Sequence, residues 1–178
     1  MNPATAIAER LALLCRMLVP YALLAVLFIL NIVPFNFIAG GSFKAAFLLM
    51  GVYYWSIFRP TLLPVWLVFV CGLLLDLLNF YPPGLNALIF VTVRWLVSDS
   101  RRFLMAQGFA MLWLVFGLVA AVSQSLQWLI YALLSHAFVP FLPVAASMGL
   151  AMALFPLVCI FLHMTHKALP NPPEKFVS

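Results

Sequence analysis

The sequence predicts an all-α integral membrane protein, and three observations support this fold class. Of its 178 residues, 67% are hydrophobic, whereas soluble domains contain roughly 45–50% apolar residues. Charged residues make up 7%, against about 25% in a typical globular protein. No acidic residue, lysine or arginine occurs from Phe103 to His166. So few polar residues cannot cover a water-exposed surface, which excludes a soluble enzyme, a nucleic-acid-binding domain and a disordered tail.

Length and cysteine content limit the organisation further. Because a membrane-spanning helix needs about 20 residues, the chain holds a single domain of at most six or seven spans. The three cysteines, Cys15, Cys71 and Cys159, are far apart and indicate neither a disulfide framework nor a zinc site. The net charge of +5 is typical of helix ends anchored at the cytoplasmic face.

Residues 1–17 predict an amphipathic helix that lies on the cytoplasmic surface of the membrane. Polar residues fall on one side of this helix and apolar residues recur on the other, as in interfacial helices. The apolar positions are Ile7, Leu11, Leu14 and Leu18. A cleaved signal peptide is not expected, because the apolar stretch from Met17 to Ala39 exceeds the usual core of about 7–15 residues.

Six spans follow when charged residues are taken as markers of depth, because charged side chains avoid the bilayer centre. The predicted spans are residues 18–38, 42–58, 62–80, 85–98, 103–134 and 144–166. Residues 167–178 form the predicted cytoplasmic tail. The second and fourth spans would rise about 25 Å and 21 Å, less than a hydrocarbon core of about 30 Å. Snorkelling of Lys44 and Arg94 would compensate for this difference.

The distribution of basic residues predicts that both termini lie in the cytoplasm. With six spans and a cytoplasmic N-terminus, only Lys44 lies outside and Arg94 falls within a span. The basic residues that then lie inside are Arg10, Arg16, Arg59, Arg101, Arg102, Lys167 and Lys175. If the short fourth segment did not cross, most basic residues would lie outside, contrary to the positive-inside rule.

Asp76 and Arg94 are expected to form a buried ion pair between the third and fourth spans. A carboxylate at this depth is costly unless it is paired or protonated. In antiparallel helices the two side chains lean toward each other, with a difference in depth of roughly 7 Å. The pair serves as a proton or substrate site, as a packing element, or as a support for a hairpin that a partner recognises. Packing is favoured, because no second acid or polar track continues from the pair.

The connection between these spans is a further candidate site. The run Pro82-Pro83-Gly84 stiffens the turn, and Asn86 is a candidate cap for the next helix. One interpretation is a tight connection between spans. The other is a preformed apolar-aromatic docking site at the membrane surface.

Polar residues in the fifth span and small residues in the sixth are candidates for helix contacts. The polar residues are Ser123, Gln124, Ser125 and Gln127, which either line a small cavity or hydrogen-bond across helices, the favoured interpretation. Ala145, Gly149 and Ala153 form a small-residue face for close approach, either inside the bundle or against a partner helix. A homodimer is among the assemblies that such a face allows.

Catalytic and metal-binding patterns are absent from the sequence. It contains no nucleophile elbow, no H-E-x-x-H, no Walker loop and no dinucleotide fingerprint. His163 and His166 have no Cys, Asp or Glu nearby in sequence and are interpreted as interfacial polar residues. We therefore expect no enzymatic activity and no metal or cofactor.

The stretch from Arg59 to Phe90 resembles the rod shape-determining protein MreD family. It combines an Arg-Pro turn, a helix end of the form Gly-x-x-x-Asp and a loop of the form Pro-x-Gly-Leu-Asn-Ala-Leu. The matching positions are Arg59, Pro60, Gly72, Asp76, Pro83, Gly84 and Asn86. The sequence departs from the family pattern at Thr61 and in the aromatic loop that begins at Asn79.

This resemblance implies a non-catalytic, multi-pass protein of the bacterial inner membrane that acts in cell-shape maintenance and peptidoglycan elongation. Proteins of this family associate with the bitopic protein MreC and, through it, with MreB filaments. The glycan polymerase RodA and a penicillin-binding transpeptidase belong to the same complex. The implied fold is similar to the substrate-binding subunits of energy-coupling-factor vitamin transporters. The alternative function is therefore a small-solute-binding transporter subunit that uses Asp76, Gln124 and Gln127, and an intramembrane enzyme is a remote third.

Overall fold

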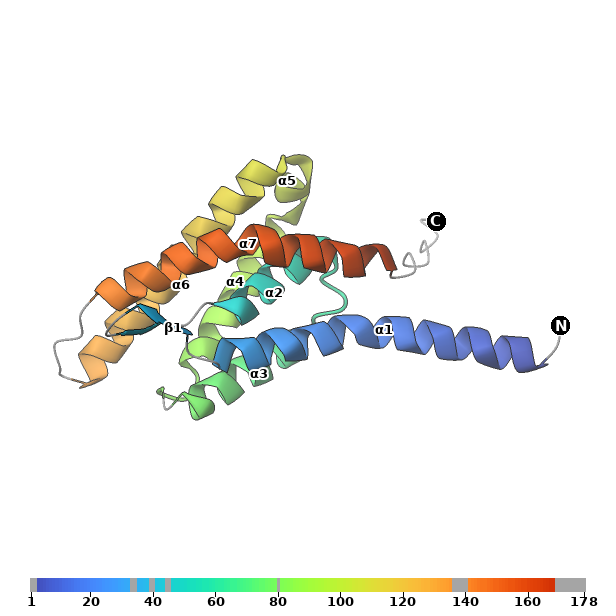
Figure 1. The fold of residues 1–178 in the computed structure, drawn as a ribbon, viewed down its shortest axis with the longest axis horizontal. Helices are drawn as coiled ribbons and strands as arrows, with labels where there is room; N and C mark the ends of the chain where they lie inside the picture. Colours follow the sequence, from blue (N-terminus) through green and yellow to red (C-terminus); the bar gives the residue numbers. More distant parts are fainter. Residues whose placement is uncertain are drawn as a thin grey trace.

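The computed structural model describes residues 3–32, 35–38, 41–43, 46–79, 81–135 and 141–168. Within these residues the chain forms seven helices and one short antiparallel sheet of two strands (Figure 1). In chain order the elements are α1 (Pro3–Ile32), β1 (Phe35–Ile38), β2 (Gly41–Phe43), α2 (Phe47–Phe58), α3 (Val65–Leu78), α4 (Leu85–Asp99), α5 (Arg101–Ala106), α6 (Phe109–Ser135) and α7 (Leu142–Ala168).

The centre of the bundle is α2, in which every residue from Phe47 to Ile57 is buried. It packs against α1, α4 and α7, so the two helical hairpins α3–α4 and α6–α7 are built around it. The hydroxyl of Tyr53 on α2 donates a hydrogen bond of 3.0 Å to the carbonyl of Leu112 on α6. The start of α1 and the end of α7 lie toward the same end of the molecule (Figure 1).

The N-terminal region differs from the expected surface helix at 1–17 followed by a span at 18–38. One continuous helix, α1, includes Pro20 and ends at Ile32. Its last residue, Ile32, stands two positions before Pro34 in the sequence, and a proline in general disfavours helical geometry at the residue that precedes it. The strand β1 occupies the end of the first expected span, and the strand β2 occupies the start of the second. The chain is therefore not purely α-helical.

The spans expected at 42–58 and 103–134 also differ from the helices found. The span expected at 42–58 is the helix α2, which starts at Phe47 because residues 41–43 belong to β2. The span expected at 103–134 is divided between α5 and α6. The division falls at Gln107, whose backbone is extended, and at Gly108, since glycine is a poor helix residue.

The described helices are consistent with a membrane helical bundle. Within the described residues, α6 and α7 contain two stretches that are long and apolar enough to cross a bilayer, Phe109–Leu134 and Leu142–Met164. Leu18–Ile32, Phe47–Phe58 and Val65–Leu78 are apolar but shorter. Large apolar side chains cover the outside of the bundle, including Leu88, Trp95, Leu118, Leu142 and Met164. Such a surface indicates an apolar environment.

Several sequence-based expectations fall on parts of the chain that the structure does not describe. Lys44, most of the connection expected between the fifth and sixth spans (residues 136–140) and most of the expected tail at 167–178 lie outside the described residues.

Candidate functional site

The α3–α4 hairpin brings the motif residues together, and its closest point of approach is at Gly72. A Cβ atom added to Gly72 would lie 2.4 Å from the Cα and 2.6 Å from the backbone nitrogen of Ala87. Only a hydrogen atom fits there, so Gly72 sets the spacing between α3 and α4. The residue that approaches Gly72 this closely is Ala87, on the second helix of the same hairpin.

Asp76 lies fully buried one turn after Gly72 and caps the start of α4. Its Oδ1 accepts hydrogen bonds from the backbone nitrogen of Asn86 at 3.0 Å and from Asn86 Nδ2 at 2.7 Å. Its Oδ2 accepts from the backbone nitrogens of Gly84 at 2.9 Å and Asn86 at 3.1 Å. A carboxylate at this position satisfies backbone N–H groups that have no partner within the helix and complements the helix dipole.

Gly84 and Asn86 have distinct roles in this arrangement. Gly84 has a φ of 98°, in the left-handed region that residues with a Cβ rarely adopt. This conformation turns its N–H toward Asp76 Oδ2. Asn86 was expected to cap its own helix, but it is instead the partner of Asp76, which supplies the cap from α3. Pro83 lies exposed at the tip of the turn.

The expected ion pair between Asp76 and Arg94 is wrong. Arg94 Nε donates to the carbonyl of Leu63, and Nη2 donates to the carbonyl of Pro60 at 3.0 Å. Arg94 lies eight residues after Asn86, which is about 12 Å along the helix axis and beyond the reach of Asp76. The non-helical turn before α3 offers carbonyls without helical N–H partners, and the guanidinium group satisfies them. The motif residue Pro60 therefore acts through its backbone carbonyl.

The polar network continues from the hairpin to α6. Gln127 Nε2 donates a hydrogen bond of 2.7 Å to Asn86 Oδ1, so Asp76, Asn86 and Gln127 connect three helices. Gln127 thereby makes the cross-helix hydrogen bond that the sequence favoured. Gln124, one turn earlier on α6, is buried, and its Nε2 has no hydrogen-bond partner within the described part of the chain.

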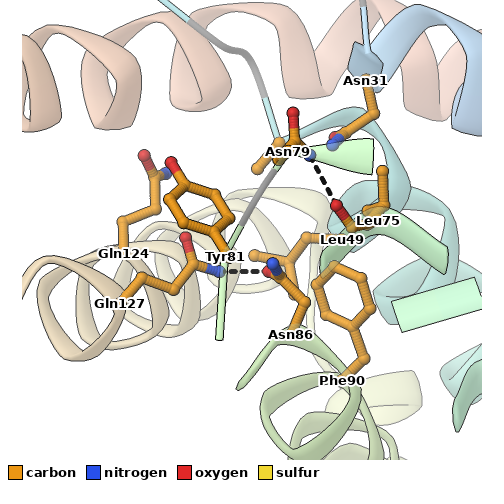
Figure 2. A pocket seen from close by; sticks show the side chains of 10 residues that line it. Asn31, Leu49, Leu75, Asn79, Tyr81, Asn86, Phe90, Gln124 and Gln127 are labelled. Atoms are coloured by element: carbon orange, nitrogen blue, oxygen red, sulfur yellow. Dashed lines mark hydrogen bonds between the residues drawn. The ribbon is translucent and has the colours of Figure 1, made fainter. Parts of the chain in front are cut away.

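These residues surround a cavity of about 70 Å³, which we call the amide cavity (Figure 2). The side chains that line it come from α1, α2, α4, α6 and the end of α3. They are Asn31, Ala46, Leu49, Leu75, Asn79, Tyr81, Asn86, Phe90, Gln124 and Gln127. Figure 2 shows the amide groups and the tyrosine ring arranged around the cavity. Both sequence-based interpretations of the fifth-span glutamines thus apply, since they line a cavity and one also bonds across helices.

Asn31 was not singled out from the sequence, and Asn79 and Tyr81 were expected only as parts of the aromatic loop between the third and fourth spans. Asn31 Oδ1 accepts from the backbone nitrogen of Leu48 at 3.2 Å, and Asn79 Nδ2 donates to the carbonyl of Leu75 at 2.9 Å. The Tyr81 ring packs edge to face against Tyr131 at 5.7 Å. Burial raises the pKa of Tyr81, and the neighbouring Tyr131 and Asp76 raise it further. Asn31, Asn79 and Tyr81 share one feature in the sequence that could have identified them: each is a polar residue at or just after the end of an apolar helix.

The small-residue face of α7 points outward. Ala145, Gly149 and Ala153 are all exposed, and a Cβ atom added to Gly149 would meet no atom within 4 Å. The sequence left open whether this face is internal or external, and the structure places it on the outside. A second outer feature is an apolar groove of about 210 Å³ between α4 and α6, lined in part by Leu88 and Val122.

The side chains brought together here are amides, one carboxylate and one phenol. Among the described residues, no group of three or more His, Cys, Asp or Glu side chains lies close enough to hold a metal ion. Within that same part of the chain His163 lies exposed near the end of α7. The arrangement is suited to holding helices together and to hydrogen-bonding a neutral group.

The fold and this network define a helical protein of the membrane type whose buried polar residues join the α3–α4 hairpin to α6. The family model described as rod shape-determining protein MreD matches residues 12–167. The chain therefore belongs to the MreD family, a bacterial membrane protein family with a role in rod-shape determination, and the resemblance seen in the sequence is confirmed. No curated protein and no solved structure matches the chain significantly.

Proposed function

We propose that this protein is a non-catalytic scaffold in the inner membrane that binds an MreC-like bitopic protein within the peptidoglycan elongation complex. The observation that carries this proposal is the family match over residues 12–167. By the same resemblance, a RodA-like polymerase, a penicillin-binding transpeptidase and MreB filaments belong to the assembly. The hydrogen bonds of Asp76 and Arg94 serve the hairpin itself, which suits a structural role.

We place the partner helix on the outward face of α7 that contains Ala145, Gly149 and Ala153. Lipid tails are as apolar as most side chains, so helices associate in membranes mainly through close packing of small residues. This face is exposed and open at Gly149. It is flanked further along α7 by Leu157 and Ile160, which are 65% and 57% exposed and provide apolar contact area.

The proposed topology has six spans with both termini in the cytoplasm. The start of α1 and the end of α7 lie toward the same end of the molecule, which supports an even number of crossings (Figure 1). The short helix α2 is buried within the bundle, whereas α3 and α4 each bury one face against neighbouring helices. Reporter fusions after Arg102 and at the C-terminus test this topology, and external signals from either would contradict it.

Co-purification with the MreC-like protein of the same host tests the scaffold and the face together. We expect the wild-type chain to retain the partner in detergent and Gly149→Leu to retain at least tenfold less. The matched control is Ala110→Leu, which adds a similar side chain to an exposed small residue on α6. Failure of the wild type to retain the partner would contradict the scaffold, whereas full retention by Gly149→Leu would contradict only the α7 face.

The size of the amide cavity weighs against the alternative of a vitamin-binding transporter subunit. The cavity measures about 70 Å³, while a cavity of about 150 Å³ accommodates a single benzene molecule. A vitamin-sized solute therefore does not fit the cavity as it stands.

A further inference from the structure

The amide cavity contains a hydrogen-bonding group that the described residues leave without a partner. Gln124 is 8% exposed, and its Nε2 has no hydrogen-bond partner in the described part of the chain. Buried polar groups in proteins are nearly always paired, with protein atoms or with a bound molecule. Rotating the terminal amide by half a turn exchanges its nitrogen and oxygen, so Gln124 can present either a donor or an acceptor to the cavity. The unpaired amide therefore indicates a missing ligand group.

The charge of the surroundings restricts what that ligand group is. None of the residues that line the cavity is charged. The nearest carboxylate in the network, Asp76, is behind Asn86 and already accepts hydrogen bonds from Gly84 and Asn86. An anion would be repelled by Asp76 and would find no cation on the cavity wall. The ligand group is therefore not an anion.

The size and the walls of the cavity restrict the ligand further. A volume of about 70 Å³ has room for a few non-hydrogen atoms. Leu49, Leu75 and Phe90 form apolar parts of the wall, opposite the amides of Gln124 and Gln127 (Figure 2). A group that places a methyl or methylene against the apolar wall and a carbonyl or hydroxyl oxygen against the amides satisfies both sides.

We propose that the amide cavity binds a small neutral group with a carbonyl or hydroxyl oxygen, such as a carboxamide or a sugar hydroxyl. The group belongs either to a free solute or to the headgroup of a neutral lipid, since both carry the same chemistry. This site is independent of the proposed partner interface on α7. Because Gln127 bonds to Asn86, a ligand that contacts both glutamines also holds α6 against α4.

The test is an NMR titration of the full chain in phosphatidylcholine nanodiscs. The side-chain amides are ¹⁵N-labelled, their chemical shifts are recorded, and acetamide is the added probe. Loss of one signal in Gln124→Met identifies the Gln124 amide. We expect acetamide to shift this signal saturably with a weak, millimolar affinity, because a ligand of four non-hydrogen atoms has little binding energy. Acetate, of the same shape but charged, is expected to cause no saturable shift.

Variants distinguish a specific site from general solvent effects. Gln124→Met, monitored through the Gln127 signal, is expected to weaken acetamide binding about tenfold, because one hydrogen bond is lost. The matched control, Gln107→Met, changes an exposed glutamine in the α5–α6 turn and is expected to bind as the wild type does. Ala46→Leu fills the cavity from the residue before α2 and leaves Gln124 in place, so it gives the same loss by a second route.

Two further arms identify the source of the ligand group. A saturable shift with diacylglycerol in the nanodisc, whose headgroup is a single hydroxymethyl group, without one from free ethylene glycol, supports a lipid headgroup. A shift with free ethylene glycol supports a solute. The proposal is overturned if neither these probes nor acetamide gives a saturable shift, which would mean that the cavity holds only water. Equal binding of acetate, or unchanged acetamide binding in both Gln124→Met and Ala46→Leu, overturns it as well.

Discussion

The hairpins α3–α4 and α6–α7 are held together in different ways. In α3–α4, Gly72 brings the backbones into contact and Asp76 binds the start of the second helix through its carboxylate. In α6–α7 the contacts are mainly apolar, with the rings of Phe116 and Phe155 stacked at 4.1 Å. The first hairpin depends on a few specific residues, whereas the second depends on total buried surface. Single substitutions are therefore expected to have larger effects in α3–α4.

The largest effect is expected for Asp76→Ala. The substitution leaves the backbone nitrogens of Gly84 and Asn86 and the Asn86 side chain without their acceptor, at a cost of about 4 kcal/mol of unfolding free energy. Asp76→Asn is expected to cost less, because its amide oxygen still accepts. Reversible unfolding in mixed micelles, followed by circular dichroism, measures both values.

The control for this prediction is Asp99→Ala, which removes an exposed acid at the end of α4. It is expected to leave the unfolding free energy unchanged within about 0.5 kcal/mol. The exchange of charges in Asp76→Arg with Arg94→Asp is expected to restore nothing, since the two side chains do not meet. Partial rescue by this exchange would instead support an ion pair and contradict the capping role.

The next effect is expected for Gly72→Ala. Its Cβ would lie 2.4 Å from the Cα of Ala87, so α3 and α4 must separate, at a cost of about 3 kcal/mol. Gly149→Ala is the matched control, because a Cβ at Gly149 meets no atom within 4 Å. The same unfolding assay compares the two variants, and equal stability would show that the hairpin tolerates a wider spacing.

Arg94→Met tests the other end of the same hairpin. The variant keeps most of the apolar stem but leaves the carbonyls of Pro60 and Leu63 without a donor, which is expected to cost about 2 kcal/mol. Limited proteolysis is expected to cut the turn between α2 and α3 faster than in the wild type. Arg102→Met, which removes an exposed arginine, is the control. If this control also increased cleavage of the turn between α2 and α3 to the same extent, a local effect of Arg94 would be ruled out.

The contrast between the hairpins also explains how far the sequence could predict the structure. Apolar length located the helices, but it did not show the strands on either side of residues 39–40 or the break at Gly108. The motif identified Gly72, Asp76 and Asn86 as a group. It did not identify their partners, because hydrogen bonds to backbone carbonyls and N–H groups leave no residue-type signal. Arg94 was assigned to Asp76, an acid on the neighbouring helix, for this reason, whereas its acceptors are carbonyls.

A smaller effect is expected in the α6–α7 hairpin, where Trp113→Phe removes one of its hydrogen bonds. Trp113 Nε1 donates to the carbonyl of Met152 at 2.8 Å, and its loss is expected to cost about 1 kcal/mol. Trp95→Phe is the control, since this side chain is 71% exposed on α4. If Trp113→Phe lowered the unfolding free energy as much as Asp76→Ala does, the proposed difference between the two hairpins would be contradicted.

The smallest effect is a loss of stability at alkaline pH that arises from Tyr81 in the α3–α4 turn. Burial first, then Tyr131 and Asp76, raise the pKa of Tyr81 above its ordinary value of 10.0. The folded state therefore holds this proton more tightly than the unfolded state. The resulting stability is fully present below about pH 10 and is lost as the pH rises through the raised pKa. Thermal unfolding from pH 8 to 11 is expected to show a decline that Tyr81→Phe reduces and Tyr21→Phe, in an exposed ring on α1, does not. An unchanged decline in Tyr81→Phe would assign the alkaline sensitivity to another part of the bundle.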